Sequence, residues 1–338
     1  MMMNPSPPTH EERCAQAVAT GRALTVSVVL CAFSSARWES LLEAVSSVAI
    51  QSPKADEVVV VIDHNSELLE RARRELPCAV VIPNRERRGL SGARNTGVQH
   101  ARSDVVAFLD DDARAQLGWL AAVVAAYSNP RVIGTTGPAE ARWTAARPSW
   151  FPEEFGWVVG CSYRGLPTST AEVRNPIGAN MSFRRRLFDI VGGFADGIGR
   201  VGSSTCGCEE TEFAIRAHRV TAGAILHLAD ARVEHRVPGD RASWRYFRSR
   251  CWSEGRSKAQ VAASVGSGRA LASERTYVTR TLPTGVARGV RDAARGDASG
   301  LLRAVAIVAG LAITTAGYGC ARVARKATRG PGSAELRA

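Results

Sequence analysis

Short apolar runs alternate with stretches of helical spacing over the first third of the chain, and this alternation constrains the fold most. The runs are rich in β-branched residues, which is typical of strands buried on both faces of a parallel sheet. We expect an α/β fold with a Rossmann-like, mostly parallel sheet flanked by helices. The expected strands are Val26–Phe33, Val58–Ile62, Cys78–Pro83 and Asp104–Leu109, and the expected helices are Trp38–Ile50, Ser66–Leu76 and Ser91–Ala101. Further along the chain, Phe183–Val191 also has helical spacing.

Charge and cysteine content indicate which binding partners and which cellular compartment to expect. The chain has 338 residues, with 44 Lys and Arg against 32 Asp and Glu, a net charge of +12. This balance suits a phosphorylated substrate or an anionic membrane surface. Because neither a zinc-finger spacing nor an aromatic and basic RNA-binding motif occurs, we expect no nucleic-acid partner. The eight cysteines lack paired spacing, which favours the reducing cytoplasm.

Acidic residues follow two of the expected strands, where open α/β sheets bind ligands. Asp63 follows the second strand, and Asp110, Asp111 and Asp112 end the fourth. Adjacent carboxylates repel one another unless a cation compensates. Asp110 and Asp112 suit Mg²⁺ or Mn²⁺ bound together with a diphosphate. The alternative is a solvated turn in which Asp112 caps a helix over residues 116–127.

A second acidic cluster, Glu209–Glu212, opens another expected helix. Negative charge at a helix N-terminus is stabilised by the helix dipole, which is the structural interpretation. In the functional interpretation, Glu210 faces the metal site and removes a proton from an acceptor hydroxyl. The residues alone leave both interpretations open.

Several short motifs follow one another along the chain, each occurring once. They are Cys31–Phe33, Asp63–Ser66, Arg88–Gly97, Leu109–Asp112, Gly178–Arg185, Gly192–Phe194 and Cys208–Phe213. Each is a weak signal alone, but in this order they resemble glycosyltransferase family 2, whose members share the GT-A fold. The resemblance covers roughly residues 24–260 and implies transfer of a sugar from a nucleotide diphosphate sugar, linked to UDP or another pyrimidine nucleotide.

The resemblance also implies the donor site. Ala32 and Phe33 would line the nucleotide pocket, and Asp63 would contact the base. Gly89 and Gly92 would let the backbone approach the donor closely, and Arg94 and Asn95 would contact the phosphates. Asp110 and Asp111 would contact the ribose or the sugar. A planar guanidinium suits phosphate oxygens, whereas a surface salt bridge is the alternative for Arg94.

The resemblance further implies an inverting, metal-dependent reaction. Asp112 would ligate Mn²⁺ or Mg²⁺, with His235 as a second ligand or, alternatively, a structural histidine. Glu210 would be the general base, where the family often has Asp, and Glu209 would support acceptor binding. The alternative is a non-catalytic nucleotide-sugar or carbohydrate-binding protein. A dehydrogenase or nucleotidyltransferase is disfavoured because no glycine-rich loop follows the first strand.

We expect three regions: a flexible tail at 1–23, a catalytic domain at 24–240 (nucleotide-sugar binding at 24–113, acceptor region at 114–240) and a helical, basic extension at 241–338. Within the extension, Arg241–Lys258 favours an interfacial helix or a domain-closing one, and the uncharged run 304–321 reaches the lower length limit of a membrane span. We expect peripheral membrane contact through 241–330, at the inner face of the cell membrane. The acceptor would be a glycan, a lipid-linked or cell-envelope molecule, or a small molecule.

Overall fold

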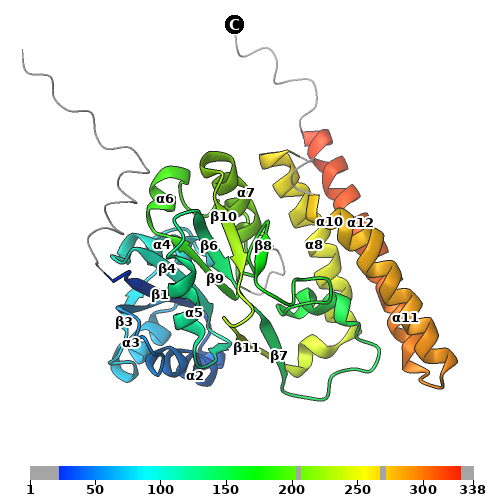
Figure 1. Cartoon of the computed structure of the whole chain (residues 1–338), viewed down its shortest axis with the longest axis horizontal. Helices are drawn as coiled ribbons and strands as arrows, with labels where there is room; N and C mark the ends of the chain where they lie inside the picture. The colour runs from blue at the N-terminus through cyan, green and yellow to red at the C-terminus, as the bar shows by residue number, and fades with distance from the viewer. Residues whose placement is uncertain (1–22, 203–206, 267–271, 329–338) are drawn as a thin grey trace, which may run out of the picture.

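The computed structural model describes residues 23–202, 207–266 and 272–328, so almost all of the expected N-terminal tail lies outside the described residues. An eight-stranded sheet with the order β3-β2-β1-β4-β9-β6-β10-β8 forms the centre of the molecule (Figure 1). Its strands are β1 (Val26–Ala32), β2 (Glu57–Ile62), β3 (Val80–Pro83), β4 (Val105–Asp110), β6 (Val132–Thr136), β8 (Ala171–Val173), β9 (Asn180–Arg184) and β10 (Ala224–His227).

The N-terminal half of the sheet is parallel, as the alternating pattern predicts. Strand β1 lies between β2 and β4 and runs parallel to both. Successive side chains of a strand point to opposite faces, so Val28 and Leu30 pack in one core cluster and Val29 in the other. Helices α2 (Trp38–Ala49), α3 (Ser66–Glu75) and α5 (Trp119–Ala126) contribute to the first cluster, and α4 (Leu90–His100), α6 (Arg186–Val191) and α7 (Glu209–Thr221) to the second.

Two local expectations are wrong. Asp112 does not cap a helix, because α5 begins at Trp119 and follows Gly118, which has a φ of +85°. The helical spacing over Phe183–Val191 is also misleading. Phe183 belongs to β9, which pairs antiparallel with both β4 and β6, and α6 starts only at Arg186. Phe183, Leu187 and Val191 stand four residues apart, so the helical spacing of α6 continues back into the strand and periodicity does not mark where the helix begins.

A small second sheet, with the order β5-β11-β7, lies beyond the end of β4. Strand β5 (Ala113–Ala115) begins directly after the three aspartates, and β11 (Val233–Val237) pairs with it antiparallel. The register places His235 opposite Ala113. Strand β7 (Ala139–Trp143) pairs parallel with β11 on its other edge. This sheet therefore brings the histidine, more than a hundred residues away in sequence, to the aspartates.

Helices of the C-terminal region pack together beside the sheet, on the right of Figure 1. Their core cluster contains Phe155 of η2 (Glu153–Val159), Phe151 just before η2, and Phe247. The helices are α8 (Trp244–Val265), α10 (Ala272–Thr276), η4 (Tyr277–Thr281), α11 (Leu282–Ala294) and α12 (Ser299–Thr328), and η3 (Gly239–Ala242) precedes them. Since Phe247 is fully buried, the expected helix at Arg241–Lys258 closes onto the core along one side.

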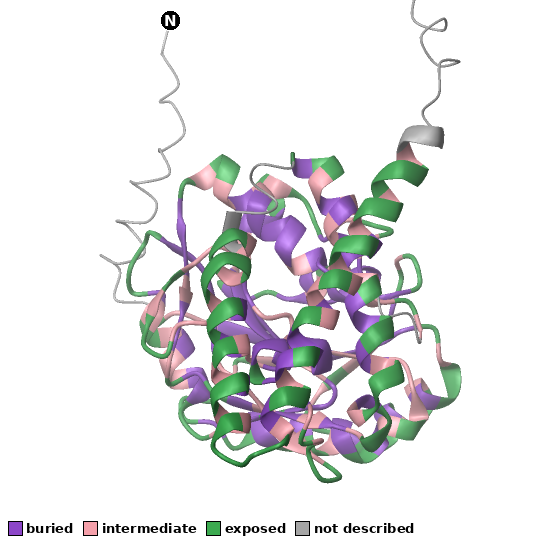
Figure 2. Ribbon diagram, turned by 90° about the vertical axis from the view of Figure 1, so that its right-hand side faces the viewer, coloured by how far each residue is buried: buried purple, intermediate pink, exposed green. Residues whose placement is uncertain are grey.

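Helix α12 packs closely on α8 but keeps an apolar outward side. A Cβ atom on Gly255 of α8 would lie 2.0 Å from the backbone oxygen of Thr314, so the two backbones touch there. By length and composition Ser299–Arg325 is apolar enough to cross a membrane, and 33% of its most apolar stretch is buried. Figure 2 faces these helices and shows largely exposed outward sides. We call Leu301, Leu302, Val305 and Val308, all more than half exposed, the outer face of α12.

Candidate functional site

Carboxylates from β4 and a histidine from β11 converge at the carboxyl end of the central strands. Asp110 is the last residue of β4, and Asp112 follows it. Oxygen atoms of Asp110 and Asp112 and a ring nitrogen of His235 all lie within 4.8 Å of one another. Two carboxylates and an imidazole form a donor set that suits Mn²⁺ and related divalent cations. The residues present therefore fit a metal, and we call them the metal group.

Neighbouring residues fix the histidine of the metal group. The His235 Nε2 atom lies 3.1 Å from Asp112 Oδ1, and its Nδ1 atom lies 3.7 Å from the Sγ atom of Cys161. Gly160 sits against the ring, where a Cβ atom would lie 3.0 Å from the imidazole. A histidine ligand that is held through its second nitrogen keeps one orientation toward the metal. The imidazole is thus positioned for ligation by groups outside the metal group.

The two members of this pair shift each other's pKa. Burial would raise the pKa of Asp112, but His235, Arg37 and Arg241 outweigh it and hold the pKa well below its usual range. Burial would lower the pKa of His235, but the Asp112 carboxylate outweighs burial and raises it to about 10. A metal ligand must be deprotonated, so metal binding at this histidine would release a proton.

Asp111 is joined to Asp112 of the metal group by Arg37, the last residue of η1 (Ser35–Arg37), whose Nη1 atom lies 3.3 Å from Asp112 Oδ2. The Asp111 Oδ1 atom accepts a hydrogen bond of 2.9 Å from Arg37, and the Asp111 Oδ2 atom is buried without a hydrogen-bond partner. Burial and the nearby Asp112 and Asp110 raise the pKa of Asp111 to about 7, although Arg37 opposes them. The guanidinium of Arg37 also lies 5.4 Å from the ring centre of Phe33.

Arg94 joins the two acidic clusters. Its guanidinium donates to Glu209 Oε1 at 2.6 Å, to Asp110 Oδ1 at 3.3 Å and to the backbone oxygen of Gly178 at 2.9 Å. The side chain is 2% exposed, so the surface salt bridge considered above is wrong. Burial would lower the pKa of Arg94, but Glu209 and Asp110 outweigh it. One buried cation therefore connects the metal group with the start of α7.

Glu210 lies in the first turn of α7, beside this bridge. One of its oxygens accepts a hydrogen bond of 3.1 Å from the hydroxyl of Thr211. Burial and the adjacent Glu209 raise the pKa of Glu210 to about 7, with Arg94 opposing. A Cβ atom on Gly178 would lie 3.4 Å from Arg94 and 3.8 Å from Glu210, so this glycine leaves room for both side chains. A carboxylate with a pKa near neutrality suits general-base catalysis.

Asp63 holds the turn that starts α4. One carboxylate oxygen accepts a hydrogen bond of 2.6 Å from Asn84, and the other accepts one of 3.0 Å from the backbone N–H of Gly89. Gly89 has a φ of +128°, and a Cβ atom on Gly92 would lie 2.0 Å from a backbone oxygen. Glycine therefore suits both positions: Gly89 because of its positive φ, and Gly92 because the backbone approaches it too closely for a side chain.

The other two donor-site predictions have distinct surroundings. Asn95 bonds the backbone of Phe194 with both polar atoms, at 2.9 and 2.8 Å, so its side chain is engaged within the protein. Ala32 is buried at the end of β1, and the backbone oxygen of the next residue, Phe33, accepts a 3.0 Å bond from Asn65. The carboxyl end of β1 thus ends beside the metal group, because β1 and β4 are paired in register there.

A cavity of about 1000 Å³ opens beside the metal group and the Glu210 carboxylate. Asp110, His235 and Glu210 line one end of it. From there it extends to α8, η4 and α12, where charged residues of α8 and threonines of η4 and α12 line it beside apolar side chains. The apolar residues that line the cavity include Phe155, Trp157, Tyr277, Leu282 and Leu311. This cavity is large enough for part of a glycan or a lipid-linked acceptor.

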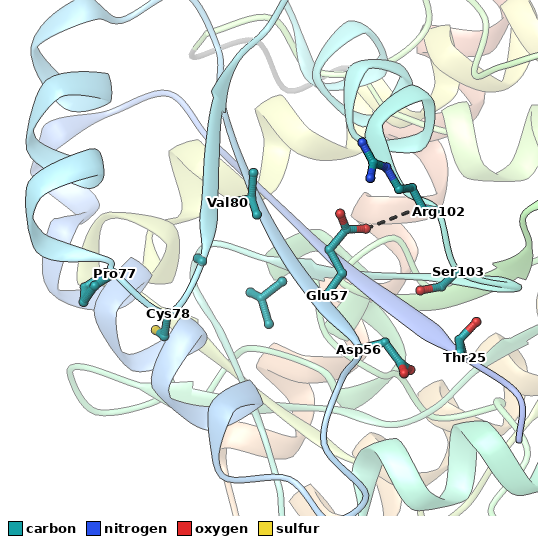
Figure 3. A pocket seen from close by; sticks show the side chains of 10 residues that line it. Thr25, Asp56, Glu57, Pro77, Cys78, Val80, Arg102 and Ser103 are labelled. Carbon is teal, nitrogen blue, oxygen red and sulfur yellow. Dashed lines mark hydrogen bonds between the residues drawn. The ribbon is translucent and has the colours of Figure 1, made fainter.

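A second pocket of about 590 Å³ lies at the opposite edge of the sheet (Figure 3). Glu57 at the start of β2 and Arg102 lie across it, and the backbone N–H of Arg102 donates to the carboxylate at 3.4 Å. Since parallel sheets bind ligands at the carboxyl ends of their strands, this pocket at the amino ends is away from the chemistry.

Comparisons with known proteins identify the family. A glucosyl-dolichyl phosphate glucuronosyltransferase of Haloferax volcanii is 38% identical over 232 residues, which cover 67% of this chain and 74% of that protein. The model of the family described as "Glycosyl transferase family 2" matches residues 27–192. The chain belongs to glycosyltransferase family 2.

A more distant relative and one solved structure are also similar to this family 2 chain. The succinoglycan biosynthesis protein ExoM of Rhizobium meliloti is 25% identical, over 72% of this chain and 77% of that protein. A mannosyltransferase of Pyrobaculum calidifontis, solved with GDP-Man and Mn²⁺, superposes with a TM-score of 0.51 and 16% identity, covering 90% and 93% of the two chains. This likeness confirms the predicted GT-A fold.

The structure adds Arg37, Arg241 and Cys161 to the site residues that the sequence of this family 2 glycosyltransferase predicts. Arg241, 5% exposed, lies with Nη2 3.4 Å from Asp112 Oδ2, and its Nη1 atom is buried without a partner. Arginines are common throughout this basic chain, so the sequence does not distinguish those two from solvated ones.

Proposed function

We propose that this glycosyltransferase moves a sugar, with inversion, from a nucleotide diphosphate sugar to a hydroxyl group of a lipid-linked glycan. One observation carries the proposal: Asp110 and His235 of the metal group line the same cavity as Glu210. A sugar donor held at Asp110 and His235 and an acceptor hydroxyl held at Glu210 would meet in this cavity. Proximity of this kind is a large part of catalysis in group transfer.

Asp110, Asp112 and His235 would hold the divalent metal. When bound, Mn²⁺ or Mg²⁺ would neutralise the charge that develops on the diphosphate leaving group. The imidazole in the donor set favours Mn²⁺, since Mg²⁺ prefers oxygen ligands. Ala32, Phe33 and Asp63, with Asp111 behind them, would line the nucleotide end, and Gly89, Gly92, Arg94 and Asn95 would form the start of α4 beneath it. Each carboxylate oxygen of Asp63 already accepts a hydrogen bond, one from Asn84 and one from the backbone of Gly89. A hydrogen bond from the nucleotide base would therefore share one of these oxygens.

Glu210 would accept the proton of the acceptor hydroxyl as that oxygen attacks the anomeric carbon. Attack from the face opposite the leaving diphosphate inverts the configuration in one displacement, without a covalent intermediate. Glu209 would position the site indirectly, because its carboxylate is bound to Arg94 at 2.6 Å. The buried charges around Glu210 keep its pKa near 7, where a carboxylate is basic enough to take a proton and still ionised.

The proposed acceptor is lipid-linked, and residues 241–338 would serve it at the membrane. Two observations support this: the Haloferax relative is named for glucosyl-dolichyl phosphate, and the cavity continues between the C-terminal helices. The outer face of α12 would rest on the cytoplasmic surface of the membrane, with Arg322 and Arg325 near its end. Apolar side chains flanked by arginines are typical of interfacial helices. In this division residues 24–240 would form the catalytic domain.

The test is nucleotide-sugar binding and donor hydrolysis across a panel of nucleotide sugars, with and without Mn²⁺ or Mg²⁺. We expect metal-dependent binding in the wild type, its loss in Asp112→Ala, and retained binding without turnover in Glu210→Gln. The exposed Asp189, on the far helix α6, supplies the control Asp189→Asn. Metal-independent binding that neither variant changes would instead identify a non-catalytic nucleotide-sugar or carbohydrate-binding protein.

A further inference from the structure

We propose that Arg200 and Arg250 form a second anion site, separate from the metal group, that binds the phosphate group linking the acceptor's sugar to its lipid. The inference rests on the proposed function, since it concerns the acceptor end of the same cavity. Both arginines line that cavity together with Glu210. A phosphate bound there would place an attached sugar next to the proposed base.

Arg250 is buried and only partly neutralised. It lies on α8 and is 7% exposed, and its Nη1 atom donates to Glu254 at 2.9 Å. Its Nε atom is buried without a hydrogen-bond partner. The carboxylate of Glu254 is shared with Lys258, whose Nζ atom lies 3.3 Å away. Lys258 also pairs with Glu274, at 2.6 Å, and Glu274 pairs with Arg174. Two carboxylates thus serve three cations, and the Nε donor of Arg250 is left unbonded in a region where buried donors are normally bonded.

Arg200 adds a second cation with no carboxylate of its own. Its backbone oxygen accepts a 2.8 Å bond from Leu90, which fixes the loop, whereas its side chain has no hydrogen bond or ion pair with the described residues. Burial lowers the pKa of Arg200, and so do the charges of Arg250 and Arg241. The Asp110 charge opposes this effect, but Asp110 is already bonded to Arg94. Like charges gathered this way are stabilised by a bound anion.

The position of Arg250 favours the acceptor over the donor, and Arg200 lies between Arg250 and the metal group, whose Asp110 charge acts on it. Arg250 comes from the C-terminal helix α8, and its guanidinium lies beside Gly207, just before α7. The donor end lies instead at the carboxyl ends of β1 and β2, where Phe33 and Asp63 are found. Apolar side chains of other elements, Leu282 of α11 and Leu311 of α12 among them, form an apolar wall of the same cavity.

The order of these surfaces matches the chemistry of one acceptor class. A hydroxyl-bearing sugar would lie at Glu210, a phosphate at the arginine pair and an isoprenoid or other lipid chain at the apolar wall. Arginine suits this role because its guanidinium stays charged when buried and can donate two parallel hydrogen bonds to phosphate oxygens. A neutral glycan would leave Arg200 without an ion pair among the described residues and Arg250 with only its shared carboxylate.

Binding of farnesyl phosphate, farnesol and inorganic phosphate tests the proposal in the full-length protein. Trp157 lines the cavity, and the Arg250 guanidinium lies 5.7 Å from its ring centre, so tryptophan fluorescence can report binding, with calorimetry as a check. The variants are Arg200→Gln and Arg250→Gln. The control is Arg248→Gln, an exposed arginine on the same helix α8. UDP binding with Mn²⁺ is measured in parallel for each protein.

We expect farnesyl phosphate to bind more tightly than farnesol or inorganic phosphate, and each cavity variant to weaken it by about tenfold or more. Farnesol and UDP binding should stay unchanged, as should every value for Arg248→Gln. Unaltered farnesyl phosphate binding in both cavity variants would overturn the proposal. So would a loss of UDP binding alone, which would assign the arginines to the donor. Absence of metal-dependent UDP binding in the wild type would instead count against the proposed function, because lipid phosphate binding is measured separately.

Discussion

The pH dependence of turnover tests the assignment of Glu210 as the base. Burial and the charge of Glu209 raise its pKa from 4.5 to about 7, while Arg94 acts in the opposite direction. A base must be ionised, so activity should rise with pH through this value. Because ionisation falls tenfold per pH unit below the pKa, turnover at pH 6 should be about one tenth of the plateau above pH 8. A glutamate with its ordinary pKa would give a flat profile over that range.

Two variants separate the base from its neighbour. Glu210→Gln removes the base and should lower turnover by about 100-fold or more while nucleotide binding persists. Glu209→Gln removes a charge that raises the pKa of Glu210, so the acidic limb should move to lower pH. Since Arg94 loses a partner in that variant, its melting temperature must be followed as well.

The assay is turnover from pH 5.5 to 8.5 with saturating donor and Mn²⁺. Saturation matters because His235 must lose a proton to bind metal, and its pKa of about 10 would otherwise add a second pH dependence. Nucleotide occupancy is measured at each pH. Turnover that is constant between pH 6 and pH 8 at constant occupancy would refute the role of Glu210, as would full activity of Glu210→Gln.

Three further predictions concern the metal, the C-terminal helices and the membrane. Asp112→Ala should weaken Mn²⁺-dependent nucleotide binding by at least about tenfold in calorimetry, whereas Asp189→Asn should not, because a lost ligand removes a charge-assisted contact. Gly255→Val should destabilise the fold by about 1–3 kcal/mol through overpacking against Thr314, whereas Gly319→Ala, with open space around it, should be neutral or stabilising; thermal melting decides between these outcomes. Serine at all four positions of the outer face of α12 should reduce flotation with anionic vesicles, and unchanged flotation would contradict membrane contact through this face.

The parallel half of the sheet was predictable because its signal is local. Each strand from β1 to β4 is a short apolar run, and the helices between them carry recognisable spacing. The position of Asp110 followed from the same pattern, since it ends such a run. The family was predictable from motifs in order, and the 38% identical relative confirms it.

Long-range pairing was much harder to predict. Nothing local in His235 indicates a partner, and its place beside Asp112 depends on the pairing of β11 with β5. Phe183 was assigned to a helix because it lies four residues before Leu187 of α6, although its pairing partners place it in β9. The bonds of Arg94 to Glu209 and Asp110 required a tertiary structure, although the sequence singled out all three residues.

The walls of the cavity come from two parts of the chain. The metal group and Glu210 belong to the sheet and α7, whereas the far walls come from α8, η4 and α12. The family model ends at residue 192, well before those helices begin. Under the proposed function, substitutions on those helices would alter which acceptor binds while the metal group and Glu210 stay in place. Chimeras that exchange these helices between relatives offer a direct route to new acceptor preferences.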